Sequence, residues 1–163
     1  MSLTGGTFEK QAAIHAWGSN ISGVVSCNAD VPGTVVQRFQ VARKATDLGN
    51  GTWHYEYAVR NHNSERSGRA LTVTFPQRHD VHQRRLQDID SHSGEPYATT
   101  DWSIGTTTSA VSWSTETYAT NQNANALRWA TMYNFWLPLE RSPALTLRRC
   151  VRGGSPPAAP GPP

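Results

Sequence analysis

The sequence has no run of apolar residues that approaches the ~18 needed for a transmembrane helix. It also lacks the nucleophile motif G-x-S-x-G, the zinc motif H-E-x-x-H and a Gly-rich phosphate loop. Each of these motifs places reactive or phosphate-binding groups at a fixed spacing. The 12 acidic residues offer many carboxylate pairs, but no spacing singles out an acid and a base. The sequence therefore predicts no membrane span and no enzyme.

Cysteine is also scarce, with Cys27 and Cys150 far apart in the chain. Neither belongs to the Cys-x-x-Cys spacing of redox and zinc sites. In an oxidising compartment the two could pair and close a long loop, whereas in the cytosol they would remain thiols. Residues 1–10 contain neither a basic segment nor an apolar one, so we expect no secretory signal there.

Positive charge is present but scattered: 15 Lys and Arg against 12 acidic residues give a net charge of +3. The densest basic clusters are the dipeptides Arg84-Arg85 and Arg148-Arg149. Nucleic-acid binding usually requires a continuous basic stripe. We therefore predict no nucleic-acid partner.

The hydrophobic fraction is 37%, below the ~45–50% of typical globular chains. However, the 6 Trp and 5 Tyr can supply much of a core, since each large ring buries on the order of 150–250 Å². A length of 163 residues is typical of one domain.

Aromatic residues alternate with polar ones over residues 52–61, as in a strand with one buried and one solvent-facing side. The buried side is predicted to hold Trp53, Tyr55, Tyr57 and Val59, and the solvent side His54, Glu56, Ala58 and Arg60. Asn50-Gly51 precedes this strand and favours a hairpin turn, and residues 61–68 form a longer turn after it.

Further strands are predicted at residues 34–46, 69–75, 102–104, 110–118 and 127–137, separated by turn residues. In the first of them, Val35, Phe39 and Val41 are expected on one face, and Arg38, Gln40 and Ala42 on the other. Residues 77–87 lack apolar periodicity and break the pattern. The expected fold is an all-β antiparallel sandwich, immunoglobulin-like or related, of about seven or more short strands.

The expected organisation is an N-terminal segment at 1–33, a β-sandwich domain at 34–150 and a Pro/Gly/Ala-rich, unstructured tail at 151–163. The N-terminal segment is poorly defined, with an edge strand as one reading. Its residues 12–17 fit either a short strand or a helical turn.

Tryptophan offers one candidate site. Alternation over residues 127–137 places Trp136 on the face opposite the core, where an exposed indole could stack on a sugar ring. Trp102 is the second candidate for carbohydrate binding. Alternation places Trp53, Trp113 and Trp129 inward, where they are expected to be core residues.

Acidic residues offer another candidate site, in the turn-rich stretch 88–101. Hard cations such as calcium bind several converging oxygens, which acidic loops supply. Asp88, Asp90, His92 and Glu95 are the candidate ligands, with calcium the first choice and zinc the weaker alternative because of His92. Equally, the carboxylates could accept hydrogen bonds from turn amides, which requires no cofactor.

Three motifs occur in order between residues 35 and 137: G-x-W-x-Y-x-Y-x-x-x-N-x-x-S-x-R, D-x-D-x-H-S-G-E-P and N-x-N-A-N-A-L-R-W-x-T-x-Y-N-F. The chain thereby resembles an uncharacterised β-sandwich domain of multidomain proteins exported by bacteria. The resemblance implies an extracellular or cell-envelope location and a modular role, with no known reaction. Residues 77–87 and the segment after Phe135 depart from the pattern, which suggests the hypothesis that both are out-of-frame readings of the coding DNA.

The expected function is that of a non-catalytic structural, adhesion-type or accessory binding module in a larger exported protein. A carbohydrate-binding module and a calcium-stabilised structural domain are the alternatives. A polysaccharide or another domain of the parent protein would then be the partner.

Overall fold

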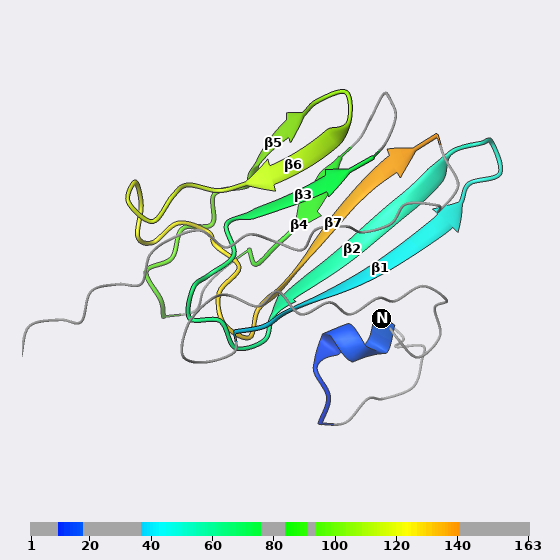
Figure 1. Cartoon of the computed structure of the whole chain (residues 1–163). Helices are drawn as coiled ribbons and strands as arrows, with labels where there is room; N and C mark the ends of the chain where they lie inside the picture. The colour runs from blue at the N-terminus through cyan, green and yellow to red at the C-terminus, as the bar shows by residue number, and fades with distance from the viewer. Residues whose placement is uncertain (1–9, 18–36, 76–83, 91–93, 141–163) are drawn as a thin grey trace, which may run out of the picture.

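The computed structural model describes residues 10–17, 37–75, 84–90 and 94–140. These residues form seven strands in two antiparallel sheets, together with one short 3-10 helix (Figure 1). The predicted all-β, antiparallel class is therefore confirmed. In the described ranges no helix is long and apolar enough to cross a membrane.

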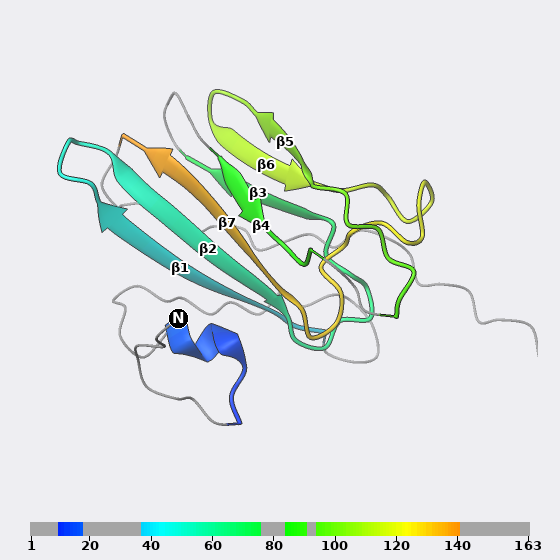
Figure 2. The same ribbon diagram turned by 180° about the vertical axis from the view of Figure 1, so that it is seen from behind.

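The larger sheet has four strands in the order β1-β2-β7-β4, and its order can be followed in Figure 2. These strands are β1 (Phe39–Asp47), β2 (Trp53–Asn61), β7 (Met132–Leu139) and β4 (Arg85–Gln87). The predicted aromatic strand is β2, which lies between β1 and β7. The turn before it has Gly49 and Gly51 at positive φ (76° and 81°), a conformation that glycine adopts without steric cost.

The smaller sheet has three strands in the order β3-β6-β5. They are β3 (Ala70–Thr74), β6 (Ala110–Ser114) and β5 (Ser103–Thr106). Trp113 of β6 lies between Leu71 and Ile104 in the strand register, so these three side chains point to the same face.

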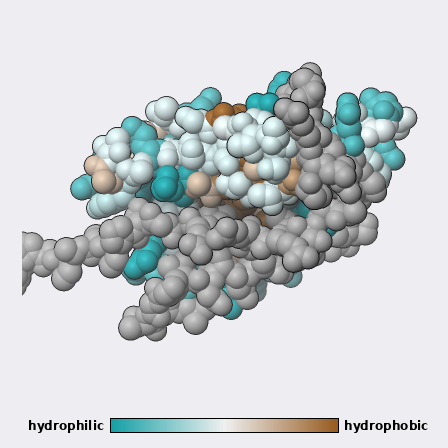
Figure 3. Space-filling view, turned by 45° about the horizontal axis from the view of Figure 1, so that its top comes forward, coloured by the Kyte–Doolittle hydropathy of each residue, from teal (hydrophilic) through white to brown (hydrophobic). Residues whose placement is uncertain are grey.

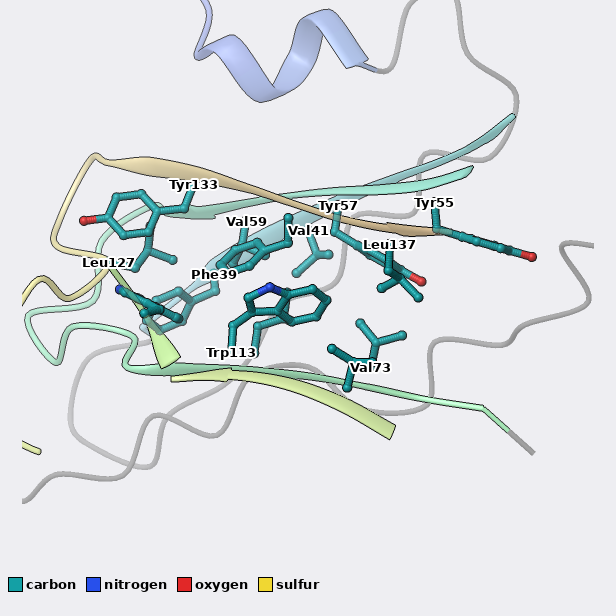
Figure 4. Close-up of a cluster of buried hydrophobic side chains, with 14 of the residues drawn as sticks. Phe39, Val41, Tyr55, Tyr57, Val59, Val73, Trp113, Leu127, Tyr133 and Leu137 are labelled. Atoms are coloured by element: carbon teal, nitrogen blue, oxygen red, sulfur yellow. The ribbon is translucent and has the colours of Figure 1, made fainter. Parts of the chain in front are cut away.

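The core contains side chains from both sheets (Figure 4). Its centre is Trp113, which is fully buried and packs edge-to-face on Phe135 of the opposite sheet at 5.5 Å between ring centroids. The predicted inward residues Tyr55, Tyr57 and Val59 are all buried, and Trp53 is partly buried at the margin. The large rings thus compensate for the low apolar fraction.

The outer face of the four-stranded sheet is partly covered by η1 (Ala13–Trp17), which resolves the stretch 12–17 as a helical turn. Ile14 of η1 packs against Ala42 of β1 and Ala58 of β2, which are both fully buried. The prediction that Ala58 faces solvent is therefore wrong, whereas Ala42 lies on the face predicted for it, opposite Phe39 and Val41, and is buried there. Small side chains at these positions let the helix approach the sheet closely.

Two strand predictions also need correction. Residues 77–87 were expected to lack a strand, yet β4 forms at Arg85–Gln87 and pairs with β7. The strand predicted at 127–137 begins instead at Met132, because a turn interrupts the extended chain before it. Cys27, Cys150, His92 and the proposed tail at 151–163 lie outside the described residues.

Candidate functional site

The acidic residues predicted to bind a metal do not gather around one point. Asp88 is partly buried just after β4, whereas Asp90 and Glu95 are exposed. Among the described residues no group of three or more His, Cys, Asp or Glu side chains could hold a metal ion. Because His92 lies outside these residues, calcium binding at this loop stays a prediction.

Asp88 instead accepts a hydrogen bond from the buried side chain of Asn125, at 2.5 Å between Asn125 Nδ2 and Asp88 Oδ2. The same Nδ2 donates to the Thr100 carbonyl at 3.1 Å, and Asn125 Oδ1 accepts from the Tyr133 hydroxyl at 2.7 Å. The Asn125 carbonyl also accepts from Trp102 Nε1. Asn125 is 1% exposed. Its hydrogen bonds join the chain after β4, the chain before β5 and strand β7 in one network centred on this buried side chain.

Burial shifts the pKa values of two side chains in this network, Asp88 and Tyr133. Burial raises the pKa of the Asp88 carboxyl above its ordinary value of 3.8, the hydrogen bond from Asn125 opposes the rise, and Asp101 and Asp90 add to it. Burial also raises the pKa of the Tyr133 phenol, and the negative charge of Asp88 adds to that rise. Tyr133 is therefore a stable hydrogen-bond donor at neutral pH.

Trp102 belongs to the core and not to a surface. It is 4% exposed and packs against Tyr133 and Phe135, with ring centroids at 5.7 and 5.6 Å. Its ring therefore offers no face on which a sugar could stack, and we withdraw it as a carbohydrate-binding residue. Its N–H donates to Asn125, so its role here is structural.

Trp136 lies on the outer face of the four-stranded sheet, as predicted from alternation. In the register it stands between Glu56 of β2 and Arg85 of β4. It is only partly exposed. Glu56 is itself within 3.6 Å of Lys44 Nζ, so this row of the sheet is largely charged.

Trp129 is 68% exposed and not part of the core, so the predicted inward position of this residue is wrong. It lies in a turn in which Thr131 donates to the Arg128 carbonyl through both its backbone N–H and its hydroxyl, at 3.1 and 2.6 Å. Ala130 follows with φ at +63°, in the left-handed region. The turn ends the alternation that would have placed the indole inward.

The position of Trp129 is held from the neighbouring loop. Its Nε1 donates to the His62 carbonyl at 2.9 Å, and the Ala130 N–H donates to the Asn61 carbonyl at 2.9 Å. The buried Asn61 side chain donates in turn to the Leu127 carbonyl at 3.2 Å. The ring is therefore held by one direct hydrogen bond to His62, and the backbone of the turn by further bonds to Asn61, the last residue of β2.

A second aromatic contact lies on the same connection between β6 and β7. The Arg128 guanidinium lies over the Tyr97 ring, 3.4 Å from its centroid, a cation–π arrangement. Arg128 Nη2 also donates to the carbonyls of Gln122 and Ala124 at 3.2 and 3.0 Å. These contacts stabilise the loop that presents Trp129.

Comparison of the chain with family models, with curated proteins and with solved structures found no match.

Proposed function

We propose that this chain is a non-catalytic binding module of an exported protein, and that Trp129 is the main contact for a glycan. The observation that carries the proposal is a 68% exposed indole whose N–H is already bonded to His62. The export and the modular role rest on the three motifs that the chain shares with exported bacterial domains.

A glycan is a suitable ligand for this exposed indole. The C–H groups of a sugar ring form a flat apolar face, which matches the face of an aromatic ring, while the sugar hydroxyls remain in water. Because the Trp129 N–H is bonded internally, the ring has one preferred orientation before any ligand arrives. Such preorganisation lowers the entropy cost of binding.

Polar side chains suited to sugar hydroxyls lie near the turn. His62 is exposed beside the carbonyl that holds the indole, and its Nδ1 lies 2.8 Å from Arg60 Nη1. Since Arg60 can only donate, the imidazole accepts at Nδ1 and carries its hydrogen at Nε2. We expect that N–H to donate to a hydroxyl oxygen of the bound sugar.

The test is a pull-down of the purified chain on insoluble polysaccharides that differ in linkage, followed by titration with soluble fragments of any that retain it. We expect Trp129→Ala to abolish retention and Trp129→Phe to weaken it, because phenylalanine keeps a ring but loses the bond to His62. Tyr118→Ala is the matched control, since Tyr118 is also exposed (47%) but lies in a different turn.

The variant Trp136→Ala distinguishes between the two candidate binding surfaces, the turn with Trp129 and the outer face of the four-stranded sheet. Loss of retention in Trp136→Ala with retention unchanged in Trp129→Ala would transfer the site to the outer sheet face and refute our assignment. Absence of retention of the wild-type chain on every polysaccharide would refute the glycan proposal itself. Melting curves of all variants establish that a loss of binding is not a loss of folding.

A further inference from the structure

Strand β5 is an edge strand of the smaller sheet, and the larger sheet does not cover its inner face. Ile104 and Thr106 are opposite Trp113 and Val111 in the register, so their side chains lie on the core-facing side. Trp113 and Val111 are fully buried, yet Ile104 is 40% exposed and Thr106 is exposed as well. The inner side of this edge strand is therefore uncovered.

The backbone of β5 has unused hydrogen-bonding groups at the same edge. The Thr107 N–H bonds to the Ala110 carbonyl at 2.8 Å, so residues 107, 105 and 103 direct their groups toward β6. In an antiparallel pair the direction alternates. The N–H and C=O groups of Ile104 and Thr106 consequently point away from β6, toward the open edge.

This edge also lacks the charges that usually prevent strands of different molecules from pairing. Residues 102–115, the whole β5–β6 hairpin with its flanks, contain no acidic, basic or histidine side chain. By contrast, the edge strand β1 has Arg43 and Lys44, and β4 has Arg85. The remaining edge strand, β3, has no charged residue of its own but directly follows Arg69. The surface around β5 and β6 is correspondingly pale in Figure 3, with strongly hydrophilic residues mainly at the two ends of the molecule.

We propose that β5 is a self-association site at which a second copy of this chain pairs antiparallel, with Gly105 on the two-fold axis. In this register Ile104 faces the partner's Thr106, and Thr106 faces the partner's Ile104. The outward N–H and C=O groups of both residues then form four hydrogen bonds across the interface. The two three-stranded sheets become one sheet of six strands, and the exposed Ile104 is covered.

A second copy fits this edge for two reasons. An isologous contact requires a surface that is complementary to itself, and a neutral strand has no like charges to oppose its own copy. Gly105 has no neighbouring atom within 4 Å of the position of a Cβ, so a side chain introduced there meets nothing on the outer face of its own sheet. A single strand pair is a small interface, so we expect a weak dimer with a Kd on the order of 100 µM.

Sedimentation velocity of the full chain over a range of concentrations, in reducing buffer, tests this dimer. We expect the average mass to rise reversibly with concentration, and Thr106→Lys to raise the Kd at least tenfold. Thr74→Lys is the matched control, because it adds the same charge at an exposed position on the opposite edge strand of the same sheet. A wild-type chain that stays monomeric at millimolar concentration, or a dimer that Thr106→Lys leaves intact, would overturn the proposal.

Disulfide crosslinking tests the register. In a chain with Cys27 and Cys150 replaced by serine, we expect Gly105→Cys to form a covalent dimer under mild oxidation, since directly opposed Cβ atoms lie roughly 4.5–5.5 Å apart. Ser112→Cys is the control, because its side chain lies on the same face but one strand further from the axis. Equal crosslinking of both variants would refute the two-fold axis at Gly105.

Discussion

Replacing Asn125 by aspartate changes one NH₂ group into an oxygen without changing the shape of the side chain. In the native protein this NH₂ donates to Asp88 at 2.5 Å and to the Thr100 carbonyl at 3.1 Å. Asn125→Asp therefore places two carboxylates in contact at a site that is 1% exposed. Both acceptors lose their donor, and a second negative charge is buried beside the first.

An unpaired buried charge typically costs about 3–5 kcal/mol, and we expect a loss in this range at pH 7. A loss of about 3 kcal/mol lowers the melting temperature by roughly 6–12 °C in a chain of this size. Asn125→Ala, which removes the hydrogen bonds but adds no charge, should cost less, about 2–3 kcal/mol. The difference between the two variants isolates the effect of the charge.

The pH dependence follows from a proton that the two carboxylates can share. Sharing raises the pKa of the pair in the folded state above its unfolded value, so the stabilisation is present in acid and is lost as the pH rises through the folded pKa. Relative to wild type, Asn125→Asp should be least destabilised near pH 4 and most destabilised near pH 7. Asn125→Ala should show no comparable trend.

The double variant with Asp88→Asn and Asn125→Asp exchanges the two side chains. The amide at position 88 can then donate to the carboxylate at position 125. Since the charge moves from a partly buried to a fully buried position, we expect partial rescue, with a coupling of about 1–2 kcal/mol in the double-mutant cycle. Urea unfolding followed by tryptophan fluorescence measures all four chains. The reasoning would be refuted if the free-energy costs of the two single variants simply added in the double variant. It would also be refuted if Asn125→Asp lost the same stability at pH 4 and at pH 7.

Two further predictions concern packing. Gly68→Ala should cost about 1–2 kcal/mol, because the new methyl group would lie 3.2 Å from Phe39 Cε1 and 3.5 Å from Leu127 Cβ; denaturant unfolding measures this, and Gly105→Ala, where nothing lies within 4 Å, should cost nothing. Ala58→Leu should displace η1 from the sheet and speed amide hydrogen exchange at Ala13–Trp17 while core amides stay protected; unchanged exchange there would contradict the packing of Ile14 on Ala58.

The sequence predicted the parts of the fold that depend on period-two alternation. Tyr55, Tyr57 and Val59 are buried as expected because β2 is extended along its whole length between two neighbouring strands. Alternation says nothing about what covers the second face of a sheet. The burial of Ala42 and Ala58 could not be predicted for this reason, since the segment that buries them, η1, lies far away in the sequence.

The error at Trp129 has a different cause. A reversal of the chain is usually marked by Gly, Asn or Pro, but this turn has alanine at the left-handed position, Ala130. An alanine there costs roughly 1–2 kcal/mol of local strain, so other contacts must hold it. The contacts that do so come from Asn61 and His62, which no pattern within residues 127–137 can reveal.

The two buried asparagines explain how this protein combines a small core with an ordered connection between β6 and β7. Asn61 bonds to the Ser64 backbone N–H and carbonyl and to the Leu127 carbonyl, and so holds the loop after β2 against the chain that leads to Trp129. Asn125, four residues before Trp129, anchors the same connection to Asp88 and Tyr133. Each amide donates two hydrogen bonds and accepts one, and at least one partner of each lies in a distant segment. Replacing either asparagine by an apolar residue would therefore leave several polar groups without their partner. The connection between β6 and β7 is therefore fixed by these polar bonds together with the burial of Leu127 in the core, while Trp129 faces solvent.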